Sequence, residues 1–366
     1  MPLMQREKHR EINVRLRILQ QGQRRGNGQG LRLNIRVQRL FFIELRELRP
    51  LMLKTIRIGT RGSRLALWQA NWVKSRIEEN FPESGVSLVV IKTRGDKILD
   101  VPLARVGGKG LFVKEIEEAL LDNRVDLAVH SMKDMPAELP PELHIGAVPL
   151  RENPNDVLIS KNNKPLSMLP AGARIGTSSL RRGSQMLNAR PDFRIEPLRG
   201  NLETRLRKLK TTDLDAIILA AAGILRMGLA NRITEYLDEN ILLPAVGQGA
   251  LCIECRKNDE KINAVLETLD HPDTRTVIMG ERAFLTRLGG GCQTPIAAFG
   301  RLENGRFTLT GMVASVDGKT LLKDTLDGNP EQSVSIGKAL GDRLIAMGAQ
   351  TIIDTLKEDF IKNETR

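Results

Sequence analysis

Short runs rich in β-branched residues alternate with helical runs along most of this sequence, and this alternation constrains the fold more than any other feature. A strand-like run at 55–59 precedes a helical run at 65–80, and a second strand-like run follows at 86–92. A strongly amphipathic helical run at 112–123 then leads to another strand-like run at 125–131. Strands that alternate with helices are typical of α/β folds. We therefore predict an α/β layout with parallel strands.

The alternation resumes after residues 151–156, where asparagines and a proline predict a crossover linker. Strand-like runs at 173–177, 193–198 and 215–220 enclose helical runs at 179–190 and 201–210, and a return segment follows at 242–255. From Pro272 the pattern changes to one helix, three glycines, strand-like runs of the antiparallel type and a final helix at about 334–357. This last part predicts a small α+β domain.

A chain of 366 residues is expected to form two or three domains. We place the first α/β domain at 52–150, together with the return segment 245–270, and the second at 151–244. The α+β domain takes 271–366.

Residues 1–51 differ from the rest of the chain. They contain twelve Lys or Arg against four Glu, so most of the net charge of +12 lies there. They lack Ser and Thr and show no sustained periodicity, which predicts a disordered extension rather than an ordinary transit peptide. The remainder is only mildly basic, and the chain is 3% aromatic, which disfavours recognition of nucleic acids by base stacking.

No apolar stretch approaches the roughly 20 residues that cross a bilayer, the longest being 216–225. Three cysteines cannot form a disulfide framework, so we expect a reducing compartment, the cytoplasm. Cys252 and Cys255 form a C-x-x-C within an apolar run that reads as a strand, where residues three apart face opposite sides. We predict buried structural thiols and no metal site.

Two segments repeat one pattern, in which a strand ends in Gly-Thr and a helix starts beside hydroxyl and arginine side chains. One contains Arg61 and Ser63, and the other contains Ser179, Arg181 and Arg182. Helix N-termini attract anions, although plain N-capping by serine is the alternative. Because capping does not require arginines, we favour an anion site.

Arg-Gly pairs occur at strand ends or helix starts, at Arg61, Arg94, Arg182 and Arg199. Together they indicate a ligand with several carboxylates or phosphates. The loop at 107–110 contains Lys109 but lacks the spacing of a nucleotide-binding P-loop. Lys133 and Asp134 follow a buried strand, where they form either an ordinary ion pair or a charged catalytic pair. On physical grounds alone that choice stays open.

Eight segments, in order, resemble the signature segments of the porphobilinogen deaminase family. They read IGTRGSRLALWQA, TRGD, VGGKGLFVKE, AVHSMKDMP, IGTSSLRR, LRGNLETRL, LPAVGQGAL and GGGCQTPIAA. The resemblance spans about Lys54 to the C-terminus. The departures are the basic extension and Arg105, where the family often has lysine. The first leaves targeting open, and the second keeps the charge but changes its geometry.

The resemblance implies two bilobed periplasmic-binding-protein-like α/β domains around a cleft, plus the small C-terminal α+β domain. It implies a monomeric transferase of heme and porphyrin biosynthesis that condenses four porphobilinogen molecules, with release of ammonia, into the linear tetrapyrrole hydroxymethylbilane. The growing chain is held on a dipyrromethane cofactor, attached covalently through a thioether to Cys292. No metal, nucleic acid or membrane partner is implied.

By the same resemblance, the cofactor is held by Lys133, Asp134, Ser179, Arg181 and Arg182, together with Cys292. The substrate and growing chain are held by Arg61, Ser63, Lys109, Arg199, Arg205 and Arg226. Asp134 is the catalytic residue, which binds pyrrole N–H groups, stabilises the azafulvenium cation and transfers protons.

Two other classes compete with this interpretation. A non-catalytic bilobed receptor for a polycarboxylate explains the arginines but does not require Cys292 after three glycines. An RNA-binding protein explains the basic extension, but the rest of the chain lacks aromatic strands of the kind that stack on bases.

Overall fold

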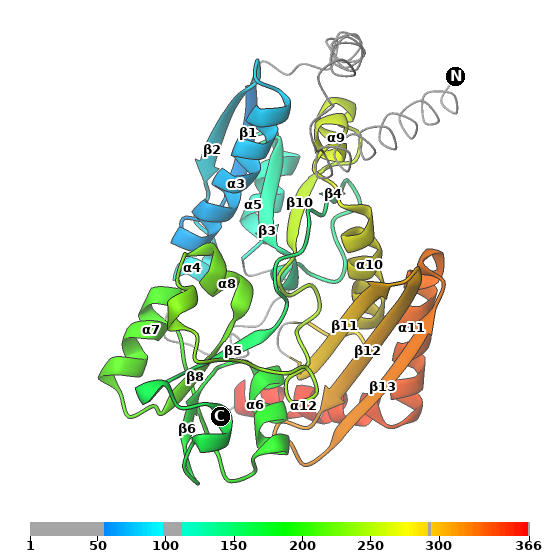
Figure 1. The fold of residues 1–366 in the computed structure, drawn as a ribbon. Helices are drawn as coiled ribbons and strands as arrows, with labels where there is room; N and C mark the ends of the chain where they lie inside the picture. The colour runs from blue at the N-terminus through cyan, green and yellow to red at the C-terminus, as the bar shows by residue number, and fades with distance from the viewer. Residues whose placement is uncertain (1–54, 98–111, 292–293, 365–366) are drawn as a thin grey trace, which may run out of the picture. The chain divides into compact units, whose positions relative to one another are not determined.

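The computed structural model describes residues 55–97, 112–291 and 294–364, which form three β-sheets with flanking helices (Figure 1). The first sheet has the strand order β2-β1-β3-β10-β4, the second β7-β6-β8-β5-β9, and the third β11-β12-β13. This architecture confirms the predicted mixed α/β class with a small additional sheet domain at the C-terminus. The exact domain limits stay predictions.

The first sheet is built from β1 (Thr55–Thr60), β2 (Gly85–Val90), β3 (Leu127–Ser131), β4 (Leu143–Ala147) and β10 (Leu251–Arg256). Its helices are α3 (Arg64–Asn80), α4 (Arg94–Lys97), α5 (Lys114–Leu121) and α9 (Glu260–Glu267). Ile56 and Ile58 of β1 are fully buried against Val73 and Ile77 of α3. Each such side chain contributes roughly 1.5–3 kcal/mol by burial, so the helix and the sheet stabilise each other.

The second sheet contains β5 (Asp156–Ser160), β6 (Arg174–Gly176), β7 (Arg194–Glu196), β8 (Ala216–Ala220) and β9 (Glu235–Tyr236). Its helices are α6 (Leu180–Ala189), α7 (Leu202–Thr211) and α8 (Ala221–Arg226). The Gly-Thr repeat falls on equivalent strands, because β1 and β6 each lie between two parallel neighbours. The two sheets therefore share one topology and place their first helices alike.

The prediction of parallel strands was wrong for one strand in each of the first two sheets. In the first sheet, β10 runs antiparallel to β3 and β4, and in the second, β5 runs antiparallel to β8 and β9. The chain reaches β5 from β4 of the first sheet, and it reaches β10 from β9 of the second sheet. Neither strand follows a crossover helix of its own sheet. Hydrophobic patterning does not record the direction of such a strand.

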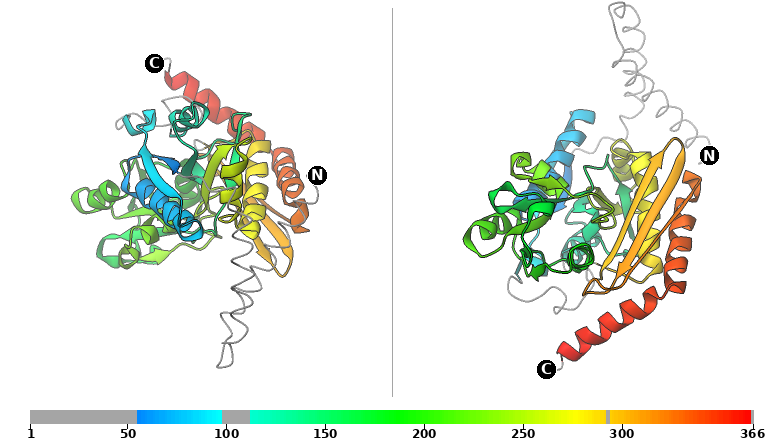
Figure 2. Two further views of the ribbon diagram at one scale, coloured as in Figure 1. Left: turned by 90° about the horizontal axis from the view of Figure 1, so that it is seen from above. Right: turned by 60° about the horizontal axis from the view of Figure 1, so that its bottom comes forward.

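The third sheet is antiparallel, with β11 (Ile296–Glu303), β12 (Arg306–Ala314) and β13 (Leu321–Gly328). Helices α10 (Pro272–Arg287) and α11 (Ser333–Ala346) cover one face of it (Figure 2). The predicted final helix is two helices, because α11 ends before Gly348 and α12 (Ala349–Glu364) begins after it. Gly348 has a φ of +103°, which L-residues with a side chain rarely adopt, so the glycine ends the helix.

Two segments, 148–155 and 237–250, connect the first two sheets and contact each other. The Glu152 N–H donates to the Gly249 carbonyl at 3.2 Å, and a Cβ on Gly249 would lie 2.3 Å from the Glu152 carbonyl oxygen. Glu281 of α10 accepts hydrogen bonds from Arg151 and from the Gly247 N–H, so it ties the third region to both connections.

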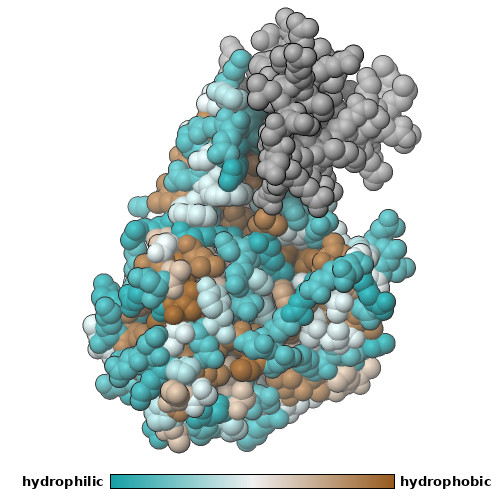
Figure 3. Space-filling model, viewed as in Figure 1, coloured by the Kyte–Doolittle hydropathy of each residue, from teal (hydrophilic) through white to brown (hydrophobic). Residues whose placement is uncertain are grey.

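Hydrophilic residues cover much of the face shown in Figure 3, and the apolar residues visible on it form separate patches. Within the described part of the chain, no helix combines the length and the apolar character needed to cross a bilayer.

Candidate active site

The end of β3 carries the two residues predicted for catalysis and cofactor binding. A short 3₁₀ turn, Met132–Asp134, follows the strand directly. Its Met132 is 1% exposed and donates its backbone N–H to the Ala250 carbonyl at 3.0 Å. The packed methionine fixes the turn against the return segment, while Lys133 and Asp134 are only partly buried. The turn therefore presents an ammonium and a carboxylate beside each other from a rigid base.

Helix α6 brings two adjacent arginines, Arg181 and Arg182, close to Lys133. Ser179 is its N-cap, and its hydroxyl accepts from the Arg182 N–H at 3.4 Å. The capping alternative is therefore observed at this serine. Arg181 and Arg182 are 5% and 6% exposed, which is unusual for arginine, and both bond to Asp156.

Helix α7 adds further positive charge. Arg205 is partly buried, and its Nε donates to the Gly200 carbonyl at 2.8 Å. Gly200 has a φ of +106°, so a residue with a side chain would strain the turn that leads into α7. Burial lowers the pKa of Arg205 to about 10, Arg182 and Arg199 lower it too, and Asp134 opposes them. These effects on Arg205 place Arg182, Arg199 and Asp134 near it, in one electrostatic cluster.

Lys133 belongs to the same cluster. Burial lowers the pKa of its ammonium group to about 8, with Arg182 and Arg181 acting in the same direction and Asp134 and Asp156 against them. A lysine with this pKa changes its charge near neutral pH, so its attraction for a carboxylate depends on pH.

A second group of predicted residues surrounds the start of α3. Ser63 caps the helix through the Ala66 N–H, and the Arg61 guanidinium lies 4.0 Å from the centre of the Phe112 ring. Arg226 of α8 donates to the Gly249 carbonyl at 2.7 Å and lies over Trp68 of α3. Burial lowers the pKa of Arg226 to about 10. These residues are positioned by their own contacts, separately from the cluster at Asp134.

Two predicted residues, Lys109 and Cys292, lie outside the described residues. The other two cysteines are described. Cys252 packs with Met132 and Ile278, and Cys255 packs with Ile56 and Ile253, so the two thiols belong to different apolar clusters. Burial raises the pKa of Cys252, and that of Cys255 to about 12. Both thiols are buried, as predicted, and are poor nucleophiles.

The described cluster suits an anionic ligand. Lys133, Arg181, Arg182, Arg199 and Arg205 bring five positive charges together, and Asp134 and Asp156 bring two negative charges. Buried or half-buried cations are costly unless anions compensate them. A ligand that carries several carboxylates provides that compensation, and Asp134 remains available to accept N–H groups. The donor set therefore fits a polycarboxylate pyrrole.

Comparison with known proteins decides the family. Residues 56–264 match the model described as "Porphobilinogen deaminase, dipyromethane cofactor binding domain", and residues 276–346 match "Porphobilinogen deaminase, C-terminal domain". The chain belongs to the porphobilinogen deaminase family. It is therefore an enzyme, and the class assigned to the family, a transferase, agrees with the prediction. The receptor alternative is not favoured.

Curated relatives agree with this assignment. The porphobilinogen deaminase of Geobacter metallireducens is 55% identical over 300 residues, which is 82% of this chain and 94% of the relative. That of Pelobacter propionicus is 52% identical over 301 residues, 82% of this chain and 97% of the relative. Among solved structures, the aliphatic sulphonate binding protein SsuA of Escherichia coli is 15% identical over 64% of this chain and 70% of its own, with a TM-score of 0.35.

Two residues of the site were missed by the sequence analysis. The sequence pattern puts Asp156 at the end of a linker and Gln248 in a return segment, yet both hydrogen bond within the arginine cluster. The pair Arg181 and Arg182 at the start of α6 was a usable signal for Asp156. Two adjacent arginines that become buried require an acidic partner.

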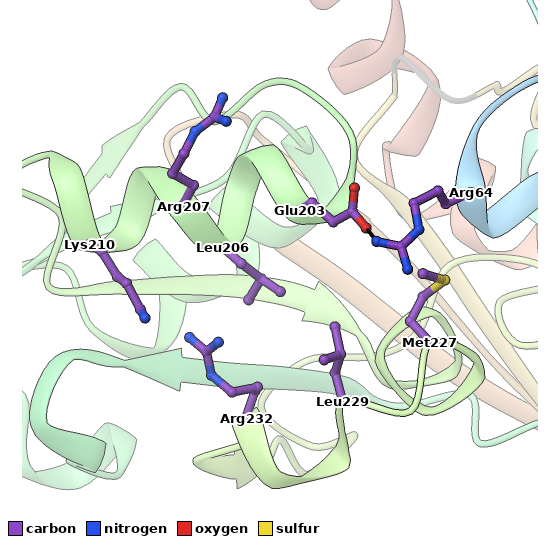
Figure 4. Close-up of a pocket in the computed structure, with 8 residues that line it drawn as sticks. All are labelled: Arg64, Glu203, Leu206, Arg207, Lys210, Met227, Leu229 and Arg232. Carbon is purple, nitrogen blue, oxygen red and sulfur yellow. Dashed lines mark hydrogen bonds and ion pairs between the residues drawn. The ribbon is translucent and has the colours of Figure 1, made fainter.

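A separate basic groove lies between α7 and the segment 227–232, with Arg64 at the start of α3 at one end (Figure 4). Its volume is about 390 Å³. Arg64 and Glu203 form an ion pair at one end, Lys210 and Arg232 lie at the other, and Arg207 points away. The residues that line the groove include none of those predicted for the site. It therefore supplies surface arginines for control experiments.

Proposed function

We propose that this chain joins four porphobilinogen molecules head to tail. At each addition the aminomethyl C–N bond of the incoming molecule breaks, a carbon–carbon bond to the growing chain forms, and ammonia and a ring proton leave; water then releases the finished tetrapyrrole as hydroxymethylbilane. The observation that carries the proposal is the cluster of Lys133, Arg182 and Arg205 around Asp134. Porphobilinogen has an acetate and a propionate on its pyrrole ring, so every ring of the growing chain presents two carboxylates. A half-buried group of cations around one carboxylate supports recognition of such a chain.

We assign the dipyrromethane cofactor to Cys292, through a thioether, and to the α6 end of the cluster. Lys133, Arg181 and Arg182 supply charge for its carboxylates, and Ser179 supplies a hydroxyl at the N-cap. The cofactor, when bound, supplies the pyrrole carbon to which the first substrate is joined. We assign Arg61, Ser63, Lys109, Arg199, Arg205 and Arg226 to the substrate and the growing chain.

Asp134 has the central role in the reaction. Its carboxylate accepts hydrogen bonds from pyrrole N–H groups and so orients the rings. As ammonia leaves the incoming substrate, positive charge develops on that pyrrole, and a fixed carboxylate stabilises it. The same carboxylate can take up and return the protons that the condensation releases.

We further propose that the enzyme acts as a monomer in the cytoplasm without a nucleic acid partner. The uneven charge supports the absence of a nucleic acid partner for the rest of the chain, because most of the surplus lies in residues 1–51. Light scattering of the purified enzyme tests the oligomeric state, and a stable dimer would contradict the proposal.

The deciding experiment combines activity with intact mass. Protein purified from cells that make porphobilinogen should be heavier than its sequence by two linked pyrroles, and it should consume porphobilinogen with release of ammonia. Protein of unmodified mass that binds porphobilinogen without consuming it would instead indicate a receptor.

A further inference from the structure

Asp156 is a fully buried carboxylate for which the proposed reaction has so far given no role. It is the first residue of β5 and has no exposed surface. Its Oδ2 accepts from Arg181 at 2.7 Å, and its Oδ1 accepts from Arg182 Nη2 at 2.6 Å and Nε at 2.9 Å. Two N–H groups of the Arg182 guanidinium thus converge on one oxygen, which fixes the plane of the group.

A third partner comes from the other connection between the sheets. The Gln248 side-chain amide donates to Asp156 Oδ1 at 3.1 Å and to the Pro154 carbonyl at 2.7 Å. The same carboxylate therefore holds residues of α6 and of the segment 237–250, and it adjoins the segment 148–155. Asp156 lies where these three parts of the chain meet.

The charges at this point are unequal. Burial alone would raise the pKa of Asp156, but Arg181 and Arg182 outweigh burial and hold the pKa at about 2, so the carboxylate is ionised at neutral pH. One negative charge thus faces two guanidinium groups. Arg181 uses a further bond to the Leu243 carbonyl and Arg182 one to the Ile218 carbonyl, so both side chains are held in place without any ligand.

We propose that Asp156 is a positioning residue: together with Gln248, it fixes Arg181 and Arg182 in the orientation in which they bind the carboxylates of the cofactor, and so places the cofactor for the incoming substrate. The inference rests on the proposed function. One carboxylate is enough to orient both guanidinium groups but leaves a positive charge uncompensated. That remaining charge is available to an anionic ligand, so orientation and attraction come from the same arrangement.

The arrangement also has a consequence for Lys133. Asp156 and Asp134 favour its protonated form, and burial, Arg182 and Arg181 oppose it. Replacing Asp156 by asparagine removes one of the two favourable charges, so the pKa of Lys133 falls below about 8. The ammonium charge is then lost at a lower pH. A role confined to stability would leave the pH dependence of substrate binding unchanged.

The test compares Asp156→Asn with Asp126→Asn as a matched control. Asp126 also lies between two arginines, Arg57 and Arg256, but it precedes β3 whereas Lys133 follows that strand. Three properties are measured for each full-length variant and for the wild type: the fraction that carries the cofactor by intact mass, KM and kcat for porphobilinogen, and kcat/KM against pH.

We expect Asp156→Asn to lower the cofactor-bearing fraction, to raise KM at least tenfold in the loaded protein, and to move the alkaline limb of the profile to lower pH. Asp126→Asn should lower the melting temperature and leave KM and the profile unchanged. Unchanged KM and an unchanged alkaline limb in folded Asp156→Asn would overturn the proposal. A wild type that does not consume porphobilinogen would instead overturn the proposed function.

Asp156→Glu covers the case in which Asp156→Asn does not fold. It keeps the charge but displaces the carboxylate by one methylene, so it retains compensation and disturbs orientation. We expect a folded protein with a raised KM and a reduced cofactor-bearing fraction. Wild-type values for both would show that only the charge of Asp156 matters, and the positioning role would be lost.

Discussion

Asp134 places a carboxylate next to Lys133 at the end of β3, in the field of Arg205. We expect Asp134→Asn to lower kcat by roughly 100- to 1,000-fold, the range typical for loss of one preorganised group that stabilises developing charge. Asp134→Glu should retain more activity because it keeps the charge but not the position. Steady-state kinetics measures both variants. Turnover in Asp134→Asn equal to that of the wild type would show that the charge of Asp134 is not needed for the reaction and that the residue is only structural.

Lys133 gives a prediction on pH. Its lowered pKa, about 8, means that it is protonated below that pH and neutral above it. Only the protonated form attracts the carboxylates of the cofactor, which must be held in place to receive the substrate. We therefore expect kcat/KM for porphobilinogen to fall as the pH rises through about 8. Lys133→Arg should move this fall to higher pH, because guanidinium keeps its proton. An identical profile in the two proteins would assign the alkaline limb to another group.

The three cysteines should differ in chemistry. We expect Cys292→Ser to fold but to lack the pyrrole colour reaction with an acidic aldehyde reagent, and to show almost no deaminase activity. Cys252→Ser and Cys255→Ser should keep both, because burial keeps those thiols protonated. Each of these two variants should lose some stability through burial of a hydroxyl. An adduct on Cys252 or Cys255, found by peptide mass mapping, would contradict the assignment.

At the scale of elements, α6 and α7 present their arginines differently. Arg181 and Arg182 of α6 are bonded to Asp156, whereas Arg205 of α7 bonds to the Gly200 carbonyl. We expect Arg181→Leu and Arg182→Leu to impair cofactor assembly, and Arg199→Leu and Arg205→Leu to impair addition of substrate to an assembled cofactor. Loss of one charged hydrogen bond costs about 1.5–3 kcal/mol.

Separation of enzyme-bound intermediates by mass distinguishes these stages. Arg207→Leu is the matched control, since it removes one arginine from the same helix at the basic groove outside the site. It should leave the intermediates unchanged. Equal, mild effects in all four site variants, with the same intermediates as the wild type, would argue against separate carboxylate partners.

At the scale of the whole molecule, we expect the chain to fold and to act without residues 1–51. The matched family segment begins at residue 56, and the basic segment has no periodic apolar face to bury. We therefore expect translation from Met52 to give soluble and fully active enzyme, measured by yield and kcat/KM. Insoluble or inactive protein would show that the segment contributes to folding.

The same truncation tests the charge of the basic segment. If residues 1–51 bind nucleic acid, only the full-length chain should be retained on DNA or RNA, and salt should release it steeply. Retention of the truncated chain would instead assign that binding to the mildly basic remainder, against the expectation from its charge.

Much of the fold follows from local patterns in the sequence. The runs at 55–59 and 112–123 became β1 and α5, because a period near two or near 3.6 in apolar residues specifies which face is buried. The short, continuously apolar run at 215–220 became β8, which is buried on both faces. Burial of Cys252 and Cys255 on opposite sides of one strand followed from the same rule.

The antiparallel direction of β5 and β10 depended instead on which sheet each strand joins, and this is a property of distant pairing. The break at Gly348 was hidden because helical periodicity continues on both sides of it. The role of Asp156 was hidden for a related reason. Its partners, Arg181, Arg182 and Gln248, lie 25 to 92 residues away, and a carboxylate in a linker shows its charge but not its neighbours. Local sequence sets conformation and burial, whereas long-range folding decides which charges meet, because Coulomb energy depends on separation in space and on burial.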